Sequence, residues 1–467
     1  MSQYDVIVIG SGPGGYVAAI HAAQSGLKTA IVEREPTKRL GGTCLLRGCI
    51  PTKAMLHTAD LLWDMQRSEE FGIPSPGPVA VDMDMMSEYR ARVVAKNANG
   101  VGFLMKKNGV DVHFGHGRLA GRGHVTVEGE DGTTTLEAKH VVLATGSACR
   151  QLPFLPVHER IIDSDYLLST TTMPEHLVVL GAGAVGSEFA SVFARYGAKV
   201  TLIERADRIL PLEDAEVSAE VEKVFKRKQK INVLTSVELK STEPHDGGVT
   251  LQIERNGKAQ TIEASHVLVA IGRRPVTDDV GLAESGVEVD ERGFVKVDGY
   301  MRTSADWVYA IGDIVQTPWL AHVASKEGIL AVDHLRGADA HPINYGHVPN
   351  CTYCSPEVAS VGLTEAAARE AGHDVRTGTF PFSANGKAGI LGKQEGFVKI
   401  VADAQYGELL GMHIVGPKAT ELITEATVAL ELESTVDEIL HTIHPHPTVA
   451  EAVGEAAHAV FGETLHA

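Results

Sequence analysis

A duplicated glycine pattern is the sequence feature that most restricts the fold of this 467-residue chain. Residues 5–10 have the composition of a buried strand, followed by GSGPGG, a helical pattern and a second strand that ends at Glu33. Residues 177–180 begin the same series, which continues with GAGAVG and ends at Glu204. In both copies the glutamate comes 23 residues after the first glycine. Two matched copies predict two β-α-β units within one chain.

The spacing further predicts that each unit binds a dinucleotide. The first glycine permits a tight turn, the second lets backbone approach a pyrophosphate, and the third lets the helix pack on the strand. The phosphates then lie at a helix N-terminus, and the glutamate accepts hydrogen bonds from ribose hydroxyls. The residues concerned are Gly10, Gly12, Gly14, Gly15 and Glu33 in the first copy, and Gly181, Gly183, Gly186 and Glu204 in the second. The alternative is two glycine turns that bind nothing.

The second copy favours NAD over NADP. Glu204 would repel a 2′-phosphate and would bond to the free ribose hydroxyl of NAD. Arg205 and Arg208 lie close by in the sequence, so NADP is disfavoured without being excluded.

The two copies differ in length, which indicates an insertion in the first. Each copy closes on a similar apolar-to-glycine turn, at residues 141–146 and 267–272, and the first span is 45 residues longer. The extra segment holds Cys44, Cys49 and a helical pattern over residues 51–108. We expect an α/β fold with two Rossmann-like domains and a C-terminal α+β dimerisation domain. The expected divisions are 1–146 (FAD, first part), 147–272 (NAD), 273–345 (FAD, second part) and 346–467 (dimerisation).

Cys44 and Cys49 lie in the sequence GGTCLLRGCIPTK, residues 41–53. In an ideal helix, five residues span a rise of about 7.5 Å, whereas a disulfide needs Cα atoms about 4.4–6.8 Å apart. A bonded pair would therefore require the backbone to leave the regular helix, and Gly41, Gly42 and Gly48 permit this. The alternative is two buried cysteines that pack as small apolar side chains.

This cysteine motif resembles that of the flavoprotein disulfide reductases, and most closely that of the dihydrolipoamide dehydrogenases. The resemblance extends from the N-terminal glycines to the C-terminal HPHPTVAE. It implies FAD in the first dinucleotide site and NAD in the second. It also implies that protein-bound dihydrolipoamide is oxidised through a Cys44–Cys49 disulfide and FAD, with reduction of NAD+. Cys44 would be the thiol that exchanges with substrate, and Cys49 the thiol that contacts the flavin.

The same resemblance assigns roles to further residues. Lys53 and Glu188 would form an ion pair beside the flavin and the nicotinamide, although an ordinary surface pair is the alternative. Asp313 would bind the ribityl chain. The remaining cofactor contacts implied are Gly42, Thr43, Gly117, Thr145, Gly146, Ala321 and His322 for FAD, and Val237 and Gly272 in the NAD domain. For Gly117 a plain turn is equally consistent with the sequence.

The C-terminal motif supplies a candidate base. By resemblance His446 is the acid/base and Glu451 orients it, since thiol attack needs a proton acceptor near neutral pH. Thr448–Glu451 also matches a TxxE capping box. The alternative is therefore that Glu451 caps the helix that follows and has no catalytic role. In the family this histidine comes from the partner subunit, which implies a homodimer.

Two stretches depart from the family pattern. Arg47 stands where valine is usual; it would either lower a thiol pKa or, as we favour, point to solvent. Cys351 and Cys354 form a CxxC where the family has no cysteines. Because this stretch reads as a strand, residues three apart would face opposite sides, so we expect a structural role and no metal site.

The charge, the N-terminal sequence and the cysteine count limit the classes of partner and the cellular compartment that we expect. The net charge of −18 and the pI near 5.6 argue against a nucleic-acid or anionic-membrane binder. The start of the sequence lacks a signal-peptide pattern, and five sparse cysteines do not resemble a secreted disulfide framework. We therefore expect a cytoplasmic homodimer that serves lipoyl-bearing subunits of a 2-oxoacid dehydrogenase or glycine-cleavage complex. The alternatives are a related reductase of another small disulfide, and a non-catalytic flavin-bearing subunit.

Overall fold

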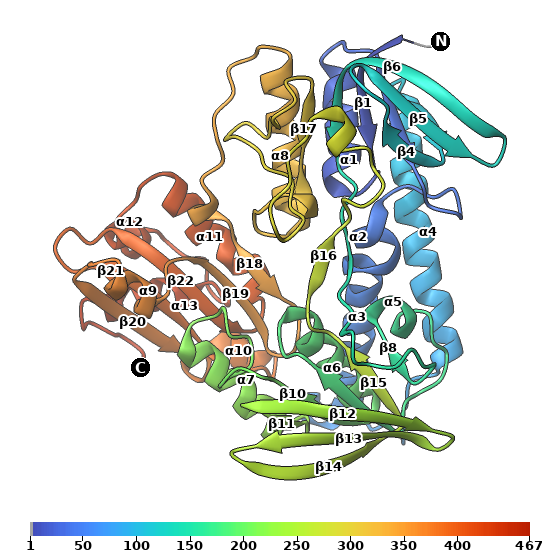
Figure 1. The fold of residues 1–467 in the computed structure, drawn as a ribbon. Coiled ribbons are helices and arrows are strands. Elements are labelled where there is room, and N and C mark those ends of the chain that lie inside the picture. Colours follow the sequence, from blue (N-terminus) through green and yellow to red (C-terminus); the bar gives the residue numbers. More distant parts are fainter. Residues whose placement is uncertain (1–2) are drawn as a thin grey trace. The chain divides into compact units, whose positions relative to one another are not determined.

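The computed structural model describes residues 3–467, drawn as a ribbon in Figure 1. These residues divide into two compact units. The first unit contains the chain up to Ala54, together with Met85–Arg150 and Arg273–Tyr345. The second contains Met55–Asp84, Gln151–Gly272 and Gly346–Ala467. Both units are therefore assembled from segments that are distant in the sequence.

The first unit is built on a seven-stranded sheet of order β3-β2-β1-β6-β5-β4, in which β17 also pairs with β6. Its parallel part is formed by β1 (Gln3–Ile9), β2 (Thr29–Glu33), β3 (Asp111–Phe114), β6 (Gly132–Leu143) and β17 (Val308–Ala310). Antiparallel β4 (His116–Leu119) and β5 (His124–Gly129) extend it. Val6, Ile7 and Val8 of β1 are fully buried, as expected for a parallel strand covered on both faces.

Helices α1 (Pro13–Gln24) and α8 (Ala321–Leu335) pack closely together within this unit. A Cβ added to Gly14 would lie 2.9 Å from the Ala324 carbonyl oxygen, and one added to Gly328 would lie 2.7 Å from the Gly14 oxygen. The close approach of the two helices therefore depends on glycine at both positions.

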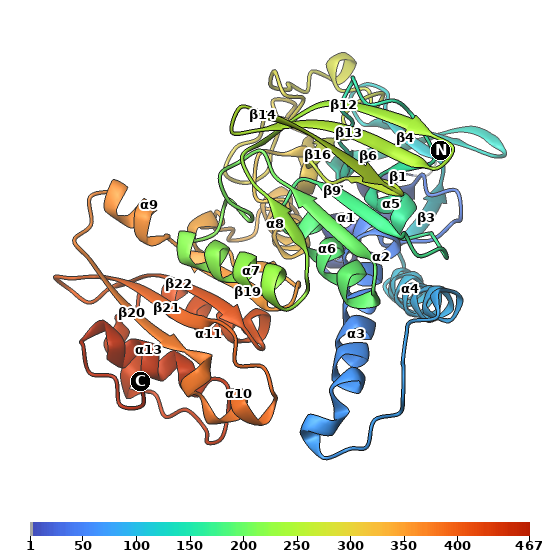
Figure 2. The ribbon, with the colours of Figure 1, turned by 90° about the horizontal axis from the view of Figure 1, so that it is seen from below.

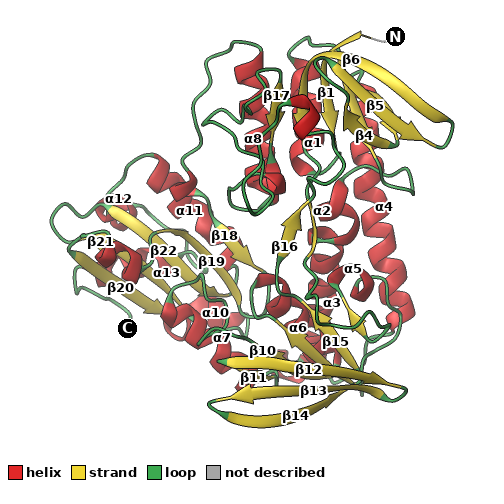
Figure 3. Cartoon of the chain, viewed as in Figure 1, coloured by secondary structure: helices red, strands yellow, loops and turns green. Residues whose placement is uncertain are grey.

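The insertion consists mainly of helices, shown red in Figure 3. It contains α2 (Gly42–Arg47), α3 (Cys49–Gln66), a 3-10 turn over Ser68–Phe71, and α4 (Met83–Lys107). Figure 2 shows α3 and α4 as separate long helices joined by an irregular connection. The helical pattern predicted over residues 51–108 thus corresponds to two helices interrupted near residues 72–82.

The second unit holds a parallel five-stranded sheet of order β11-β10-β9-β15-β8. Its strands are β8 (Ile161–Ile162), β9 (His176–Leu180), β10 (Lys199–Ile203), β11 (Asn232–Leu234) and β15 (His266–Val269). Two of its helices are α6 (Ala184–Tyr196) and α7 (Ala215–Arg227). A separate antiparallel sheet is formed by β12 (Val237–His245), β13 (Gly248–Arg255) and β14 (Lys258–Ala264).

The C-terminal part of the second unit is an antiparallel sheet of order β18-β19-β22-β21-β20. These strands are β18 (Asn350–Thr352), β19 (Glu357–Gly362), β20 (Val375–Pro381), β21 (Phe397–Asp403) and β22 (Leu409–Gly416). Helix α11 (Ala419–Glu431) contacts β19 and β22, and α13 (Glu451–Val460) contacts β20 and β21. Helices and an antiparallel sheet share one apolar core here, as the predicted α+β class requires.

Candidate active site

The two glycine turns have the same geometry in their respective units. An added Cβ at Gly10 would lie 2.2 Å from the Ala144 oxygen, and one at Gly181 would lie 2.5 Å from the Ala270 oxygen. At Gly15 and at Gly186 the Cβ would lie 1.9 Å from the oxygen of the first glycine. The first and third glycines therefore let strand, turn and helix touch through backbone in both copies.

The middle glycines differ, because space is open in front of them. Gly12 and Gly183 are the N-cap residues of α1 and α6, and a Cβ added to either would meet nothing within 4 Å. A helix N-terminus behind an open glycine turn suits a pyrophosphate, since free N–H groups and the helix dipole both favour negative charge.

Each glutamate is held by the turn that it follows. Glu33 accepts hydrogen bonds from Ser11 N (2.9 Å), Ser11 Oγ (2.6 Å) and Glu35 N (2.9 Å). Glu204 accepts from Ala182 N (2.7 Å) and Ala206 N (2.8 Å). A carboxylate has about four acceptor positions, so both side chains retain capacity for a ribose hydroxyl. The residues present therefore fit a dinucleotide in each turn.

Asp313 has the environment expected of a ligand to a polyol chain. It follows β17 in the 3-10 turn Gly312–Ile314, and its carboxylate accepts a hydrogen bond from Ser147 Oγ at 2.5 Å. Arg273 Nε in turn donates to Ser147 Oγ at 2.7 Å. Burial raises the pKa of Asp313, opposed by the Ser147 bond and the charge of Arg273. Further hydroxyl donors would offset the cost of that buried charge.

The remaining predicted FAD contacts lie in the first unit. Thr145 Oγ1 donates to the Val276 oxygen at 2.6 Å, and Gly146 has φ +73°. Ala321 and His322 begin α8, next to its N-cap Leu320. Gly117 lies inside strand β4 and not in a turn; its added Cβ would meet Val32 Cγ1 at 2.9 Å, so glycine serves packing there.

Two predicted NAD-domain residues lie beside their glycine turn in the second unit. Val237, the first residue of β12, donates its backbone N–H to the backbone carbonyl oxygen of Glu204 at 3.0 Å. Gly272 follows β15 and has φ +108°, a conformation that favours glycine.

A helix break brings the two cysteines together. Helix α2 ends at Arg47 and α3 begins at Cys49, with Gly48 between them. A Cβ on Gly48 would lie 2.9 Å from the Thr43 oxygen and 3.3 Å from Cys44 Cα. The backbone thus leaves the regular helix between the cysteines, as predicted for a bonded pair, and both residues carry free thiols here.

The cysteine pair contacts the first glycine turn through α2. Gly42, with φ +59°, lies so near Gly12 that an added Cβ would be 2.6 Å from the Gly12 Cα. Thr43 follows it in the first turn of α2, directly before Cys44. The redox motif therefore packs against the turn that we expect to bind FAD.

The surroundings of Cys44 raise the pKa of its thiol. A hydrogen bond with Cys49, burial, and the charge of a Cys49 thiolate raise the pKa of Cys44, while Lys53 opposes them. A negative charge on one thiol disfavours a second charge beside it. The reduced pair therefore favours one negative charge over two.

Glu188 is buried in the first half of α6, where its carboxylate accepts a hydrogen bond from Tyr353 N at 2.9 Å. Lys53 lies on α3 in the first unit, whereas Glu188 belongs to the second. Their ion pair therefore stays a prediction.

His446 and Glu451 form the predicted base-and-orienter pair. His446 Nδ1 lies 2.8 Å from Glu451 Oε1, and the His446 side chain is 80% exposed. Glu451 Oε2 accepts from Thr448 N at 2.8 Å. Slight burial opposes these bonds, yet the Thr448 and His446 bonds together lower the pKa of Glu451. One carboxylate thus serves both roles weighed from the sequence, orienting the ring and binding backbone.

The complete capping box, which the sequence offered as the alternative role of Glu451, is absent from this turn. Helix α13 has Ala450 at its N-cap without a side-chain cap bond, and Thr448 Oγ1 instead donates to the Pro445 oxygen at 2.7 Å. The helix begins two residues later than a Thr448 N-cap would place it, and the threonine hydroxyl bonds to the preceding loop.

Sequence reasoning missed Glu425, which supports the loop that carries His444 and His446, called the histidine loop below. His444 Nε2 lies 2.9 Å from Glu425 Oε1, and Gly454 leaves room for the ring, because its added Cβ would lie 3.0 Å from His444 Nδ1. The Glu425 bond raises the pKa of His444, opposed by burial. Nothing in the local sequence of α11 distinguishes Glu425 from the other glutamates of that helix.

Of the two departures from the family pattern, one needs an addition and the other a correction. The Arg47 side chain is partly exposed, as expected, and its guanidinium also pairs with the carboxylate of Glu35. Strand β18 ends at Thr352, so Cys354 does not lie in it; tight packing buries Cys354 instead, and its Sγ bonds to the Pro356 oxygen at 3.2 Å. Burial raises the pKa of Cys354, which favours an inert thiol.

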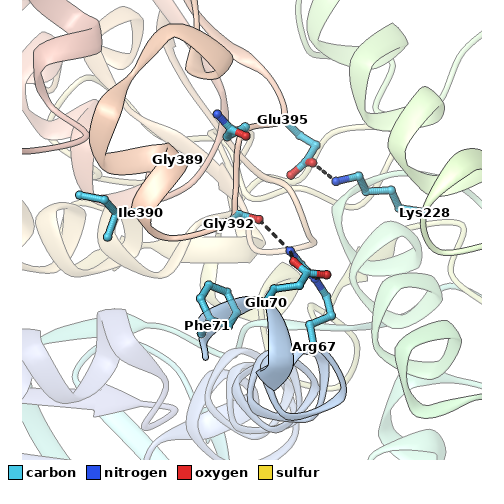
Figure 4. Close-up of a pocket in the computed structure, with 9 residues that line it drawn as sticks. Arg67, Glu70, Phe71, Lys228, Gly389, Ile390, Gly392 and Glu395 are labelled. Atoms are coloured by element: carbon cyan, nitrogen blue, oxygen red, sulfur yellow. Dashed lines mark hydrogen bonds and ion pairs between the residues drawn. The ribbon is translucent and has the colours of Figure 1, made fainter. Parts of the chain in front are cut away.

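A polar pocket of about 350 Å³ lies in the second unit (Figure 4). Its cations are already paired: Arg67 donates to Glu70 and to the Gly392 oxygen, and Lys228 pairs with Glu395. The predicted catalytic residues are not among those that line it. Within residues 3–467, no cluster of His, Cys, Asp or Glu could hold a metal ion. In the same range, no helix combines the length and apolarity needed to cross a membrane.

Comparison with known families decides the class of this site. A family model described as pyridine nucleotide-disulphide oxidoreductase matches residues 4–328. The chain belongs to this family. The dimerisation domain of the same family matches residues 348–457. Membership confirms the predicted fold class, the oxidoreductase chemistry, and FAD and NAD as cofactors. The dimerisation domain supports the predicted homodimer.

The chain is similar to curated proteins over its whole length. It is 47% identical to the dihydrolipoyl dehydrogenase of Zymomonas mobilis, over 99% of each chain. It is 44% identical to that of Bacillus subtilis, covering 100% of this chain and 99% of the relative. Among solved structures, LpdA of Mycobacterium tuberculosis has a TM-score of 0.89 at 28% identity, over 98% of this chain and 99% of that one.

Proposed function

We propose that this chain is an NAD-dependent dihydrolipoyl dehydrogenase, which oxidises dihydrolipoyl groups carried by other proteins. The observation that carries the proposal is the helix break at Gly48, which joins Cys44 and Cys49 beside the first glycine turn. Full-length relatives of that name at 44–47% identity support it.

The thiol chemistry uses the His446–Glu451 pair as base and the Cys44–Cys49 pair as oxidant. His446, oriented by Glu451, accepts the proton of a substrate thiol, and the resulting thiolate attacks Cys44 Sγ of the Cys44–Cys49 disulfide. That disulfide breaks, and Cys49 leaves as a thiolate while a substrate–Cys44 disulfide forms. The second substrate thiol then attacks this mixed disulfide and its proton passes to Cys44, so that oxidised lipoyl is released, Cys44 leaves as a thiol, and Cys49 remains a thiolate while His446 holds the first proton. The protein dithiol now carries the two electrons.

The cofactors are held by the residues described above. FAD, when bound, supplies the two-electron link between the dithiol and NAD+. Gly12 and Glu33 would hold its pyrophosphate and ribose, and Asp313 its ribityl chain. Gly183 and Glu204 would hold NAD. His446 would come from the partner subunit, so a complete site would require the homodimer.

The partners of this activity are lipoyl-bearing subunits of a 2-oxoacid dehydrogenase or glycine-cleavage complex. We place the protein in the cytoplasm, because its few cysteines divide into one redox pair and scattered thiols, as is typical of reducing compartments.

Steady-state assays test the proposal. We expect turnover of dihydrolipoamide with NAD+, far weaker turnover with NADP+, and faster turnover of a lipoylated protein domain than of free thiols such as reduced glutathione. Absence of dihydrolipoamide oxidation by flavin-loaded protein that reduces another small disulfide with NADH would overturn it in favour of a related reductase. The structural likeness to RclA of Escherichia coli, an HOCl-induced flavoprotein disulfide reductase (TM-score 0.87, 25% identity, 97% of this chain and 99% of that one), makes this comparison necessary.

A further inference from the structure

The first β-α-β copy, which carries the redox motif, has polar side chains at two positions where the second copy has alanine. Ser11 stands where the second copy has Ala182, and Glu35 stands where it has Ala206. The backbone bonds are equivalent, since Glu33 accepts from residues 11 and 35 as Glu204 does from 182 and 206. The first copy therefore adds two side chains that the bonds between turn and glutamate do not require.

Ser11 connects Glu33 to the beginning of α2. Its hydroxyl donates to Glu33 Oε2 at 2.6 Å and accepts from Gly41 N at 3.1 Å. Gly41 is the N-cap residue of α2, and Ser11 is fully buried. One hydroxyl thus joins the ribose carboxylate to one end of the helix that carries Cys44.

Glu35 connects the same carboxylate to the other end of α2. Its backbone N–H donates to Glu33 Oε1 at 2.9 Å, and its carboxylate pairs with Arg47, the last residue of α2. The Glu35 side chain is only 11% exposed, so it is largely shielded from water. Loss of Arg47 would leave a largely buried carboxylate without its cation.

We propose that Ser11, Glu35 and Arg47 are positioning residues that couple the FAD ribose site at Glu33 to the geometry of the redox helix α2. The inference rests on the proposed function, because it takes FAD as the ligand of the first turn. A six-residue helix cannot hold its own orientation in water, so α2 depends on its attachments at both ends. The NAD turn lacks such attachments, as suits a cofactor that leaves in every catalytic cycle.

The coupling is reciprocal: ribose occupancy steadies α2, and an anchored α2 slows loss of the flavin. Variants of the holoenzyme test the second of these two effects. Ser11→Ala and Glu35→Ala give the first turn the residues of the second, and Arg47→Val removes the cation. Lys38→Gln is the matched control, because Lys38 forms an exposed ion pair with Glu130 just beyond the same turn.

Flavin release after transfer to flavin-free buffer, followed by flavin fluorescence, is the first readout. We expect release about tenfold faster in Arg47→Val and unchanged in Lys38→Gln. Arg47→Val with Glu35→Ala should release flavin no faster than Arg47→Val alone, because the pair acts as one unit. Arg47→Lys should restore most of the retention. If Arg47→Val fails to fold, the two alanine variants carry the same comparison.

The second readout is the alkylation rate of Cys44 in NADH-reduced holoenzyme, measured by mass spectrometry. This rate would not change if Ser11, Glu35 and Arg47 only stabilised the fold. We expect Arg47→Val to raise it about threefold or more, because one end of α2 is released. Wild-type flavin release and wild-type Cys44 alkylation in Arg47→Val would overturn the proposal. A wild-type holoenzyme that retains FAD but does not oxidise dihydrolipoamide would count against the proposed function alone, since neither readout uses that substrate.

Discussion

At the scale of single residues, a carboxylate can orient a base and bind backbone at once. Glu451 does both, through its two oxygens on His446 and on Thr448 N. The 80% exposure of the His446 side chain leaves its other ring nitrogen accessible to a substrate thiol. The predicted catalytic role and the structure of the loop therefore depend on the same side chain.

Replacing this pair separates the two roles. His446→Gln should lower kcat for dihydrolipoamide oxidation about 10²- to 10⁴-fold, since no base remains, with little change in NADH-driven reduction of an artificial electron acceptor. Glu451→Gln should lower this kcat less than His446→Gln does, because its amide oxygen can still accept from Thr448 N. His441→Gln, an exposed histidine at the end of α12 (Val436–His441), is the control. Unchanged kinetics in Glu451→Gln would reduce Glu451 to a structural residue.

At the scale of elements, one glycine separates the two helices that carry the cysteines. Gly48→Ala should lower dihydrolipoamide oxidation about tenfold or more and destabilise the protein by about 1–3 kcal/mol, because its Cβ would press on the Thr43 oxygen. Steady-state rates and urea unfolding measure both effects. Gly102→Ala in α4 is the control, since its Cβ would meet nothing within 4 Å and alanine favours a helix. Equal behaviour of the two variants would contradict this explanation of the break.

The attachment of α11 to the histidine loop predicts a pH dependence of stability. The Glu425 bond raises the folded pKa of His444 above its ordinary value near 6.5, so the charged pair stabilises the fold fully below about pH 6.5. This stability is lost as pH rises through the folded pKa. Glu425→Gln should therefore cost about 1 kcal/mol at pH 6 and less at pH 9. Urea unfolding of both proteins at the two pH values measures the difference; a cost that grows with pH would contradict it.

At the scale of the whole molecule, the proposed dimer makes each site depend on two chains. Co-expressing Cys44→Ser and His446→Gln chains should restore about a quarter of wild-type activity, although each variant alone is inactive. Half of randomly assembled dimers are mixed, and each mixed dimer has one site with both residues intact. Activity of the unfractionated co-expressed protein measures this quarter, and purified mixed dimers should show about half of wild-type activity. No recovery in mixed dimers would show that cysteine and histidine act within one chain.

Much of the fold was readable from the sequence because it is local and periodic. The glycine turns and their flanking strands follow from residue spacing, and both turns have the predicted packing at Gly15 and Gly186. The family resemblance added the long-range roles, such as those of Cys44 and His446, which no local pattern contains. Where local signals competed, as at Thr448 and Cys354, the helix start and the strand end were misjudged.

The sequence by itself determined the two dinucleotide turns, the cysteine pair and the class of chemistry, because each depends on residue types at short, fixed spacings. Only the tertiary structure decided what holds these parts in place. Arg47 meets Glu35, His444 meets Glu425, and Glu188 meets Tyr353 N across 12 to 165 residues of sequence. Such contacts follow from how strands and helices pack, so the partner of a charged side chain emerges only when the chain is folded.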